Sequence, residues 1–215
     1  SRGTTGNDAA LYTTSTLALR PETGKLEWYH QFIPGESLDL DEVYERVLVD
    51  VDGRKLSFNI GKPGILWKLD RQTGQFLDAK ETVYQNVFVW KDKSKGQIAY
   101  RPDILEQKTG YWVPACPGTA GGKDWQTMSY DPQTQTLVIP LTQACMEMNG
   151  RVVNKGDGGG GTAQPRQRVL PRAGGLVFAG QRQLRSRVAA GGAPFHVVER
   201  KNSHTQSLAK RQVSA

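Results

Sequence analysis

The sequence has no long apolar run and no helix-length apolar pattern. Although 37% of the 215 residues are hydrophobic, no run approaches the roughly 20 residues that a membrane-spanning helix needs. Apolar residues also do not recur at the three- and four-residue spacing of an amphipathic helix. The 24 glycines and 11 prolines instead indicate many turns. We therefore expect an all-β chain without a transmembrane segment.

Cysteine is scarce, and the histidines are scattered. Cys116 and Cys145 are the only cysteines, 29 residues apart. A structural zinc site needs about four ligands at short spacings, so this pair does not form one. The residues alone leave open whether the two are buried thiols or a disulfide. His30, His196 and His204 form no catalytic set with a nucleophile motif.

Acidic residues are almost absent from the end of the chain. Residues 165–215 hold ten Arg or Lys against one acid, Glu199, which gives this segment a net charge of +9. Because the whole chain carries +7, residues 1–164 are close to neutral. A basic tail alone does not make the basic stripe that phosphate binding requires. We expect no nucleic-acid partner.

One turn pattern recurs three times. Each copy reads as a strand, a turn built on Asp or Thr-Gly, and a second strand, at residues 18–28, 68–78 and 129–139. Asp and Thr side chains bond to nearby backbone, and Gly supplies the positive φ of a tight turn. The repeat glycines are Gly24 and Gly74, with Gln135 in the third copy, so the spacings are 50 and 61 residues. These spacings are close to the length of a β-propeller blade.

The segments between the turns are rich in β-branched and aromatic residues, which favours strands. The expected strands are residues 10–19, 25–32, 43–51, 56–60, 64–69, 87–90, 98–100, 111–113 and 137–141. Together they predict consecutive hairpins of a β-meander.

Two carboxylates, Asp39 and Asp41, follow a Pro-Gly turn two residues apart. They could reach one bound cation, because hard cations are held by several oxygen ligands. A solvated acidic loop is the alternative. Further on, Lys62 lies on a sharp corner between Gly61 and Pro63-Gly64, where its ammonium could be aimed at a ligand or remain a surface charge.

Two glycine-rich stretches follow. The first, residues 116–126, has too many glycines for a strand and could bring its backbone close to a ligand. It ends in Asp124 and Trp125, and the Trp ring could stack on a ligand or simply pack. The second, residues 156–161, spells GxGxxG. We reject a dinucleotide site there, because no helix pattern follows and the surroundings are all-β.

The repeats resemble the tryptophan-docking motif of the quinoprotein alcohol dehydrogenases. These are eight-bladed β-propellers with pyrroloquinoline quinone (PQQ) and a metal ion on the central axis. In that family the Trp of one blade lies between the Ala of its own repeat and the Gly of the next blade. The first copy keeps Ala18, Gly24 and Trp28, with Arg20 where Asp is usual. The later copies lack the Ala and the Trp.

The resemblance implies roles for the site residues. Asp39 becomes the catalytic base and a metal ligand, and Lys62 contacts the quinone. Asp124 and Trp125 match the quinone-contacting Asn-Trp of the family, with Asp124 in place of Asn. Within the family, a second Asp two residues after the base accompanies lanthanide use, so Asp41 predicts a lanthanide as readily as Ca²⁺.

The resemblance also implies the chemistry and the compartment. It predicts oxidation of a primary alcohol to an aldehyde by metal-assisted hydride transfer to PQQ, and a cytochrome c-type electron acceptor. It predicts a periplasmic location, where disulfides persist, with a disulfide between Cys116 and Cys145. The alternative is a non-catalytic propeller scaffold, which gives no reason for Asp39, Lys62 and the cysteine-containing loop to occur together.

The resemblance covers part of the chain. Residues 1–163 read as middle blades, about four in number, which form an incomplete ring. Residues 164–215 read as a basic tail without alternation or turns, apart from a blade-like strand at 174–180. We favour a shift of reading frame over a genuine tail. Because the chain starts at Ser1 without a charged and apolar leader, we expect it to be a piece of a longer protein.

Overall fold

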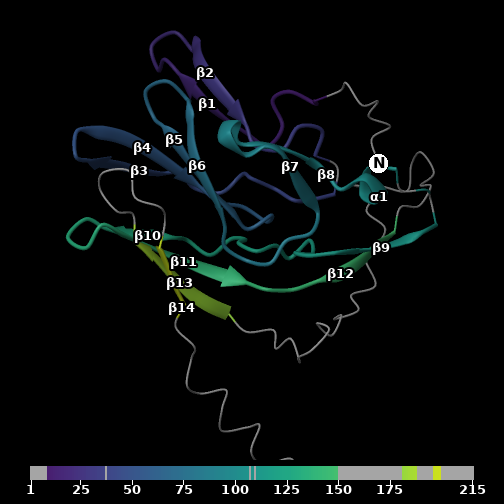
Figure 1. Ribbon diagram of the computed structural model, residues 1–215. Coiled ribbons are helices and arrows are strands. Elements are labelled where there is room, and N and C mark those ends of the chain that lie inside the picture. The colour runs from purple at the N-terminus through teal and green to yellow at the C-terminus, as the bar shows by residue number, and fades with distance from the viewer. Residues whose placement is uncertain are drawn as a thin grey trace, which may run out of the picture.

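The computed structural model describes residues 9–36, 38–106, 108, 110–149, 181–187 and 196–199. Within this part the regular secondary structure is almost entirely antiparallel strand, so the all-β prediction is confirmed (Figure 1). Its one α-helix, α1 (Pro102–Leu105), is a single turn, and η1 (Lys93–Lys95) is a short 3-10 turn. No described helix is long and apolar enough to cross a bilayer.

The strands form two four-stranded sheets and three two-stranded sheets. The first four-stranded sheet pairs β3 (Val47–Val51), β4 (Arg54–Asn59), β5 (Ile65–Asp70) and β6 (Phe76–Glu81) in chain order. The second has the order β10 (Ser129–Asp131), β11 (Thr136–Thr142), β13 (Gln181–Arg187) and β14 (His196–Glu199). Two of the two-stranded sheets are hairpins, β1 (Ser15–Leu19) with β2 (Leu26–Gln31) and β7 (Phe88–Asp92) with β8 (Gln97–Tyr100). The third pairs β9 (Trp112–Ala115) with β12 (Met146–Asn149), which are far apart in the chain.

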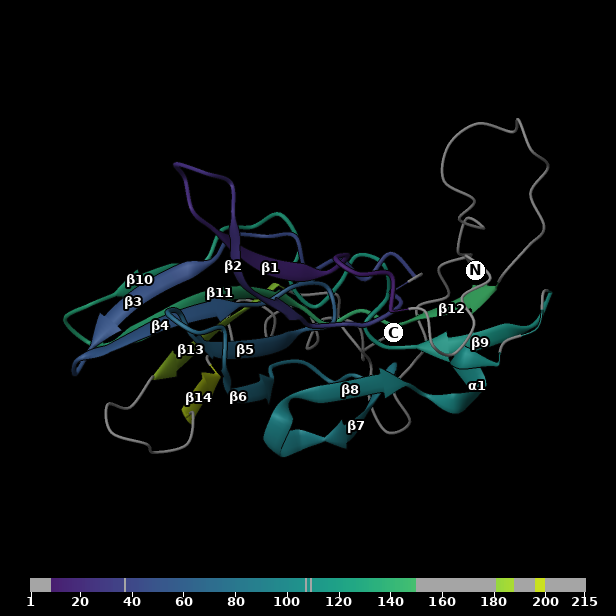
Figure 2. The same ribbon diagram turned by 90° about the horizontal axis from the view of Figure 1, so that it is seen from above.

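The sheet β3–β6 lies in the middle (Figure 2), and its central strands β4 and β5 have buried side chains on both faces. Successive side chains of a strand point to opposite faces, so Trp67 and Leu66 of β5 belong to different core clusters. Trp67 packs in a cluster with residues of β7, β8 and β9. Leu66 packs in a second cluster with residues of β10, β11 and β4. A buried strand flanked in this way suits the middle of a stack of blades.

The repeat turns have the predicted construction. Asp70 Oδ1 accepts hydrogen bonds from the Gln72 and Thr73 backbone N–H groups, both at 2.9 Å, and Gly74 donates to the Asp70 carbonyl at 2.9 Å. Gly74 has φ +74°. In the third copy Gln135 takes the glycine position with φ +51°. The positive φ is therefore common to all three turns, whereas the Asp and the Gly are each present in only two of them.

The structure also shows the docking of one repeat on the next. Ala18 of β1 lies opposite Trp28 of β2, and the Gly74 turn of the following sheet lies against the Trp28 ring. A methyl group added at Gly74 would lie 2.5 Å from the Trp28 Cε3 atom. Gly74 is thus needed both for its backbone conformation and for the space it leaves to the ring. This contact confirms the motif on which the family resemblance depends.

Two predicted strands begin later than expected. β1 starts at Ser15 rather than at residue 10, because residues 11–14 form a turn. β3 starts at Val47 rather than at residue 43. There the Arg46 guanidinium donates to the backbone carbonyls of Glu42 and Tyr44, so residues 42–46 stay outside the sheet and lie at the site.

Two segments of the basic tail, in which the sequence shows no side-chain alternation, form strands. β13 pairs along its full length with β11, from Thr136 opposite Arg187 to Thr142 opposite Gln181, and β14 pairs with β13. Ladder pairing uses backbone groups, so a strand can add to a sheet edge without side-chain alternation. The proposed strand at 174–180 and the GxGxxG stretch lie outside the described residues. The boundary at 163/164 and the frame shift stay predictions.

Replacing Gly74 with Ala should destabilise the fold by about 2–4 kcal/mol, since the methyl group meets the Trp28 ring in addition to the strain of a positive φ. Gly24 is the matched control. It occupies the same repeat position with φ +68°, and nothing lies within 4 Å of an added methyl group. Gly24→Ala should cost only about 1 kcal/mol. The measurement is denaturant unfolding of both variants, and equal losses would contradict the docking role of Gly74.

His30 provides a pH-dependent contribution to stability. It packs against Phe32, Trp67 and Phe76, and its Nε2 atom is buried without a hydrogen-bond partner. Burial lowers the pKa of His30 to about 4. The unfolded chain, with a His pKa near 6.5, therefore binds the proton first, and stability falls as the pH drops from about 6.5 to 4.

A His30→Phe variant should lose part of this acid sensitivity. Unfolding measured between pH 7.5 and 4 should show wild type losing roughly 3 kcal/mol more than the variant. The difference between the two proteins should stay constant above pH 7.5, where His30 is neutral in both states. Parallel pH curves throughout would show that His30 is not the titrating group.

Candidate active site

The segment that carries Asp39 and Asp41 is anchored by apolar side chains at both ends. Phe32 and Ile33 precede the Pro-Gly turn with 1% exposure each, and Leu40 is fully buried. Between these anchors Asp39 is exposed and has φ +64°, a conformation that non-glycine residues rarely adopt. Packing of these apolar side chains in the core therefore fixes the backbone that carries the two carboxylates.

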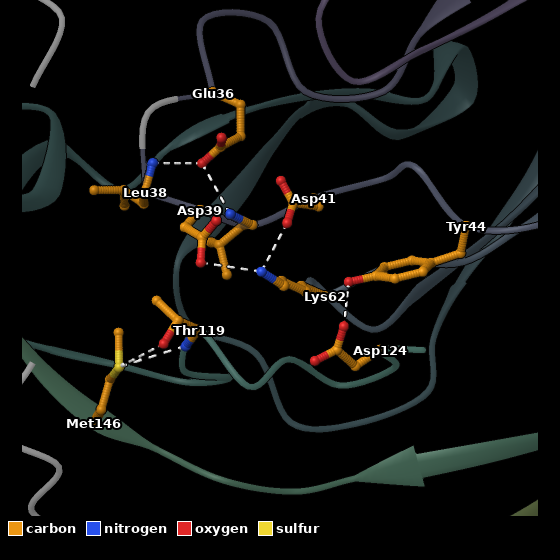
Figure 3. Close-up of polar contacts among 10 residues, drawn as sticks. Glu36, Leu38, Asp39, Asp41, Tyr44, Lys62, Thr119, Asp124 and Met146 are labelled. Atoms are coloured by element: carbon orange, nitrogen blue, oxygen red, sulfur yellow. Dashed lines mark hydrogen bonds and ion pairs between the residues drawn. The ribbon is translucent and has the colours of Figure 1, made fainter. Parts of the chain in front are cut away.

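Asp39 and Asp41 converge on the ammonium group of Lys62. Lys62 Nζ lies 3.1 Å from Asp39 Oδ2 and 2.7 Å from Asp41 Oδ2 (Figure 3). The Lys62 side chain is 9% exposed, whereas those of Asp39 and Asp41 are 48% and 36% exposed. Burial alone would lower the pKa of Lys62, but the hydrogen bonds and charges of Asp41 and Asp39 outweigh it and raise the pKa. Lys62 is therefore charged at neutral pH.

Backbone contacts hold the Lys62 corner in place. The Lys62 N–H donates to the Asp41 carbonyl at 2.9 Å, and Gly122 donates to the Lys62 carbonyl at 2.6 Å. A methyl group at Gly121, which has φ +75°, would lie 2.7–2.8 Å from three Lys62 atoms. The glycine-rich loop therefore approaches the Lys62 corner closely, which a side chain at Gly121 would prevent.

The same loop brings Asp124 and Trp125 beside the carboxylate segment. Tyr44 donates its hydroxyl to Asp124 Oδ1 at 2.5 Å, and burial, followed by this hydrogen bond, raises the pKa of Tyr44. The Trp125 side chain is highly exposed, with a relative exposure of 81%, and its ring meets that of Tyr44 edge-on at 5.8 Å. The Trp125 ring is open to a ligand rather than packed in the core.

An ion pair between the buried Lys123 and the partly exposed Glu45 holds this loop against the segment before β3. Lys123 is 1% exposed, its Nζ lies 2.6 Å from Glu45 Oε2, and it stands 4.4 Å from the centre of the Tyr44 ring. Glu45 also accepts the Met128 backbone N–H at 2.7 Å. Burial alone would raise the pKa of Glu45, but these hydrogen bonds lower it. Glu45 thus joins both ends of residues 123–128 to the site.

Glu42, next to Asp41 in the chain, is fully buried. Its carboxyl group accepts hydrogen bonds from Asn59 Nδ2 at 2.5 Å and Trp67 Nε1 at 3.3 Å. Burial raises the pKa of Glu42 to about 8. This carboxyl faces the protein interior, whereas Asp39 and Asp41 face outward, so adjacent acids have different roles.

Cys116 and Cys145 form a disulfide, as the resemblance implied. The disulfide joins the start of the glycine-rich loop to the residue before β12. The same loop is held further along by the Thr119 N–H, which lies 3.4 Å from the Met146 sulfur (Figure 3). These two contacts hold the loop on either side of Gly118.

The residues present are suitable for a metal ion and an anionic quinone. Two carboxylate oxygens that already converge on one cationic atom are the ligand type that hard cations require. Lys62 provides a charged donor for carbonyl or carboxylate oxygens. No group of three or more His, Cys, Asp or Glu able to hold a metal occurs among the described residues. The described chain thus supplies part of a coordination sphere.

Sequence reasoning identified the residues that converge but missed those that hold them. Asp39, Asp41 and Lys62 were singled out, and the structure brings all three together, with Asp124 and Trp125 at the adjacent loop. Their proposed ligands stay predictions. The missed residues are Glu36, Glu45, Tyr44 and Lys123. For Lys123 the paired glycines before it were the only signal, because Tyr44 and Glu45 lie about 80 residues from their partners Asp124 and Lys123. The backbone partners of Glu36 lie within four residues of it.

The fold and the site together define a β-propeller of the quinoprotein dehydrogenase type. Residues 2–83 match the family model described as the β-propeller domain of glucose, ethanol and alcohol dehydrogenases that use PQQ. The lanthanide-dependent methanol dehydrogenase of Methylacidiphilum fumariolicum (strain SolV) is 34% identical over 146 residues, which is 65% of this chain and 23% of that protein. The dehydrogenase subunit of the quinone-type alcohol dehydrogenase of Acetobacter aceti is 32% identical over 142 residues, covering 64% and 19%.

Solved structures give the same result. A europium-containing methanol dehydrogenase aligns with a TM-score of 0.61 and 31% identity over 70% of this chain and 26% of that one. The quinohemoprotein alcohol dehydrogenase of Comamonas testosteroni aligns with a TM-score of 0.70 and 26% identity, over 89% and 30%. Residues 2–83 thus match a PQQ-type β-propeller domain, and the relatives that the chain resembles are quinoprotein methanol and alcohol dehydrogenases. The chain spans about a fifth of the length of these curated relatives.

The Glu45 and Lys123 pair should respond asymmetrically to mutation. Glu45→Ala leaves the buried Lys123 ammonium without its anion and should cost about 3–5 kcal/mol. Lys123→Met leaves Glu45, whose side chain is 31% exposed, in contact with water and should cost only about 1 kcal/mol. Denaturant unfolding measures both, and the double variant should recover part of the Glu45→Ala loss. Equal losses of unfolding free energy in the two single variants would contradict the expectation that the buried Lys123 depends on Glu45 more than Glu45 depends on Lys123.

Proposed function

We propose that this chain is part of a periplasmic PQQ-dependent alcohol dehydrogenase that oxidises primary alcohols to aldehydes. The observation that supports it most directly is the convergence of Asp39 and Asp41 on Lys62 Nζ at 3.1 and 2.7 Å. A scaffold propeller would need the blades and their docking contacts. It would have no use for two half-exposed carboxylates held against a buried ammonium.

In this proposal Asp39 and Asp41 hold the metal ion, and Lys62, Asp124 and Trp125 contact the quinone. When bound, the metal would supply Lewis-acid catalysis and the quinone would be the hydride acceptor. Asp39 takes the proton from the alcohol hydroxyl, for which its exposed carboxylate is accessible. The Lys62 ammonium stabilises negative charge on nearby oxygens, since it is buried and remains protonated.

The identity of the metal depends on Asp41. A second carboxylate adds more binding energy for a trivalent than for a divalent ion, because Coulomb energy scales with charge. The relatives named for a lanthanide and for europium support this choice. The disulfide supports a periplasmic location, since disulfides persist in oxidising compartments. A cytochrome c-type protein is the proposed electron acceptor.

Cation binding by the full chain tests the site directly. Tb³⁺ should bind with sensitised luminescence, and Asp39→Asn or Asp41→Asn should each weaken it about tenfold or more. Asp41→Asn should reduce the affinity for Ca²⁺, measured by its competition with Tb³⁺, less than it reduces the affinity for Tb³⁺. Asp78→Asn, on β6, is the matched control and should leave both affinities unchanged. Equal affinities for wild type and Asp41→Asn would exclude Asp41 as a ligand.

A further inference from the structure

We propose that Glu36 is the positioning residue that fixes Asp39 in its binding geometry. This inference rests on the proposed role of Asp39 and Asp41 in the cation site. Glu36 was not singled out by its sequence context. It lies three residues before Asp39, and in Figure 3 its carboxylate oxygen is bonded to backbone nitrogens of the same segment.

One carboxylate oxygen of Glu36 accepts backbone hydrogen bonds from the residues on both sides of Asp39. Glu36 Oε1 lies 2.5 Å from the Leu38 nitrogen and 3.1 Å from the Leu40 nitrogen. The Tyr100 hydroxyl donates to the same oxygen at 3.4 Å. Glu36 is only 8% exposed, so water competes little for these donors.

These two bonds bracket a backbone conformation that Asp39 would otherwise avoid. Asp39 has φ +64°, and a non-glycine residue remains in that region only where its surroundings hold it there. With the amides of Leu38 and Leu40 fixed to one oxygen, the intervening Asp39 must turn its side chain outward. That turn directs its carboxylate toward Lys62 (Figure 3).

The other contacts of the segment act elsewhere: the Lys62 N–H bonds to the Asp41 carbonyl, beyond Leu40, and does not reach the amides that flank Asp39. Leu40 is fully buried and anchors the segment in the core. The Lys62 ammonium contacts the Asp39 carboxylate at 3.1 Å. The Lys62 contact involves a side chain that a bound cation must share or displace. Glu36 acts on the backbone, so its hold on Asp39 persists when a ligand replaces the Lys62 contact.

The experiment compares Glu36→Met with Glu36→Gln in the full chain. Both variants remove the charge and keep a side chain of similar length, and only Gln retains an acceptor oxygen. Hydrogen exchange of the Leu38 and Leu40 amides is measured beside Tb³⁺ affinity, with the β5 amides as the reference. Charge-assisted hydrogen bonds to buried amides contribute enough that their loss should speed local exchange about 10- to 100-fold.

We expect Glu36→Met to accelerate exchange at Leu38 and Leu40 alone and to weaken Tb³⁺ binding about tenfold. Glu36→Gln should restore both quantities to within about fivefold of wild type. Equal Tb³⁺ losses in the two variants would mean that Glu36 acts only through its charge, and this would overturn the proposal. Unchanged exchange at Leu38 and Leu40 in Glu36→Met would also overturn it.

Two further outcomes are informative. If Glu36→Met does not fold, hydrogen exchange of the unaltered chain tests the proposal instead. Exchange of the Leu38 and Leu40 amides at unprotected rates would show that they are not bonded to Glu36. If the unaltered chain binds no Tb³⁺ through Asp39 and Asp41, the proposed cation site fails. The exchange comparison then still shows whether Glu36 holds the backbone around Asp39.

Discussion

The site depends on a charged ammonium held at 9% exposure between two carboxylates. An unpaired ammonium at this depth would be costly, so Lys62 requires Asp39 and Asp41, and both require a backbone that places them two residues apart on one side. Glycines at positions 61, 121 and 122 let three chain segments meet there with little side-chain volume between them. The apolar clusters on either side of the central sheet then fix those segments relative to one another.

Further polar contacts hold Asp39, Asp41 and Lys62 in place. Glu36 holds the backbone around Asp39, Glu45 and Lys123 hold the glycine-rich loop, and Tyr44 links that loop to the carboxylate segment. These residues are more buried than the acids they support, or bound to buried partners. Solvent therefore reaches the outward carboxylates, where a cation would bind, and is largely kept from the bonds that orient them.

The accuracy of the sequence-based predictions followed the range of the interactions involved. The Asp70 turn and the Trp28 contact with Gly74 were predictable, because turn chemistry is local and the docking motif recurs in the family. The start of β3 was not, because Arg46 removes residues 42–46 from the sheet by binding their carbonyls. The pairing of β13 with β11 was missed because backbone pairing leaves no mark in side-chain alternation.

By itself, the sequence determined the strand-rich character, the repeat turns, and the pair of acids followed by a lysine on a glycine corner. These follow from short-range rules of backbone conformation and residue chemistry. Only the tertiary structure decided that Asp39, Asp41 and Lys62 meet at one point, and that Glu42 beside them faces the core instead. The reason is physical: convergence depends on how separate segments pack, and no spacing along the chain encodes the distance between side chains that packing brings together.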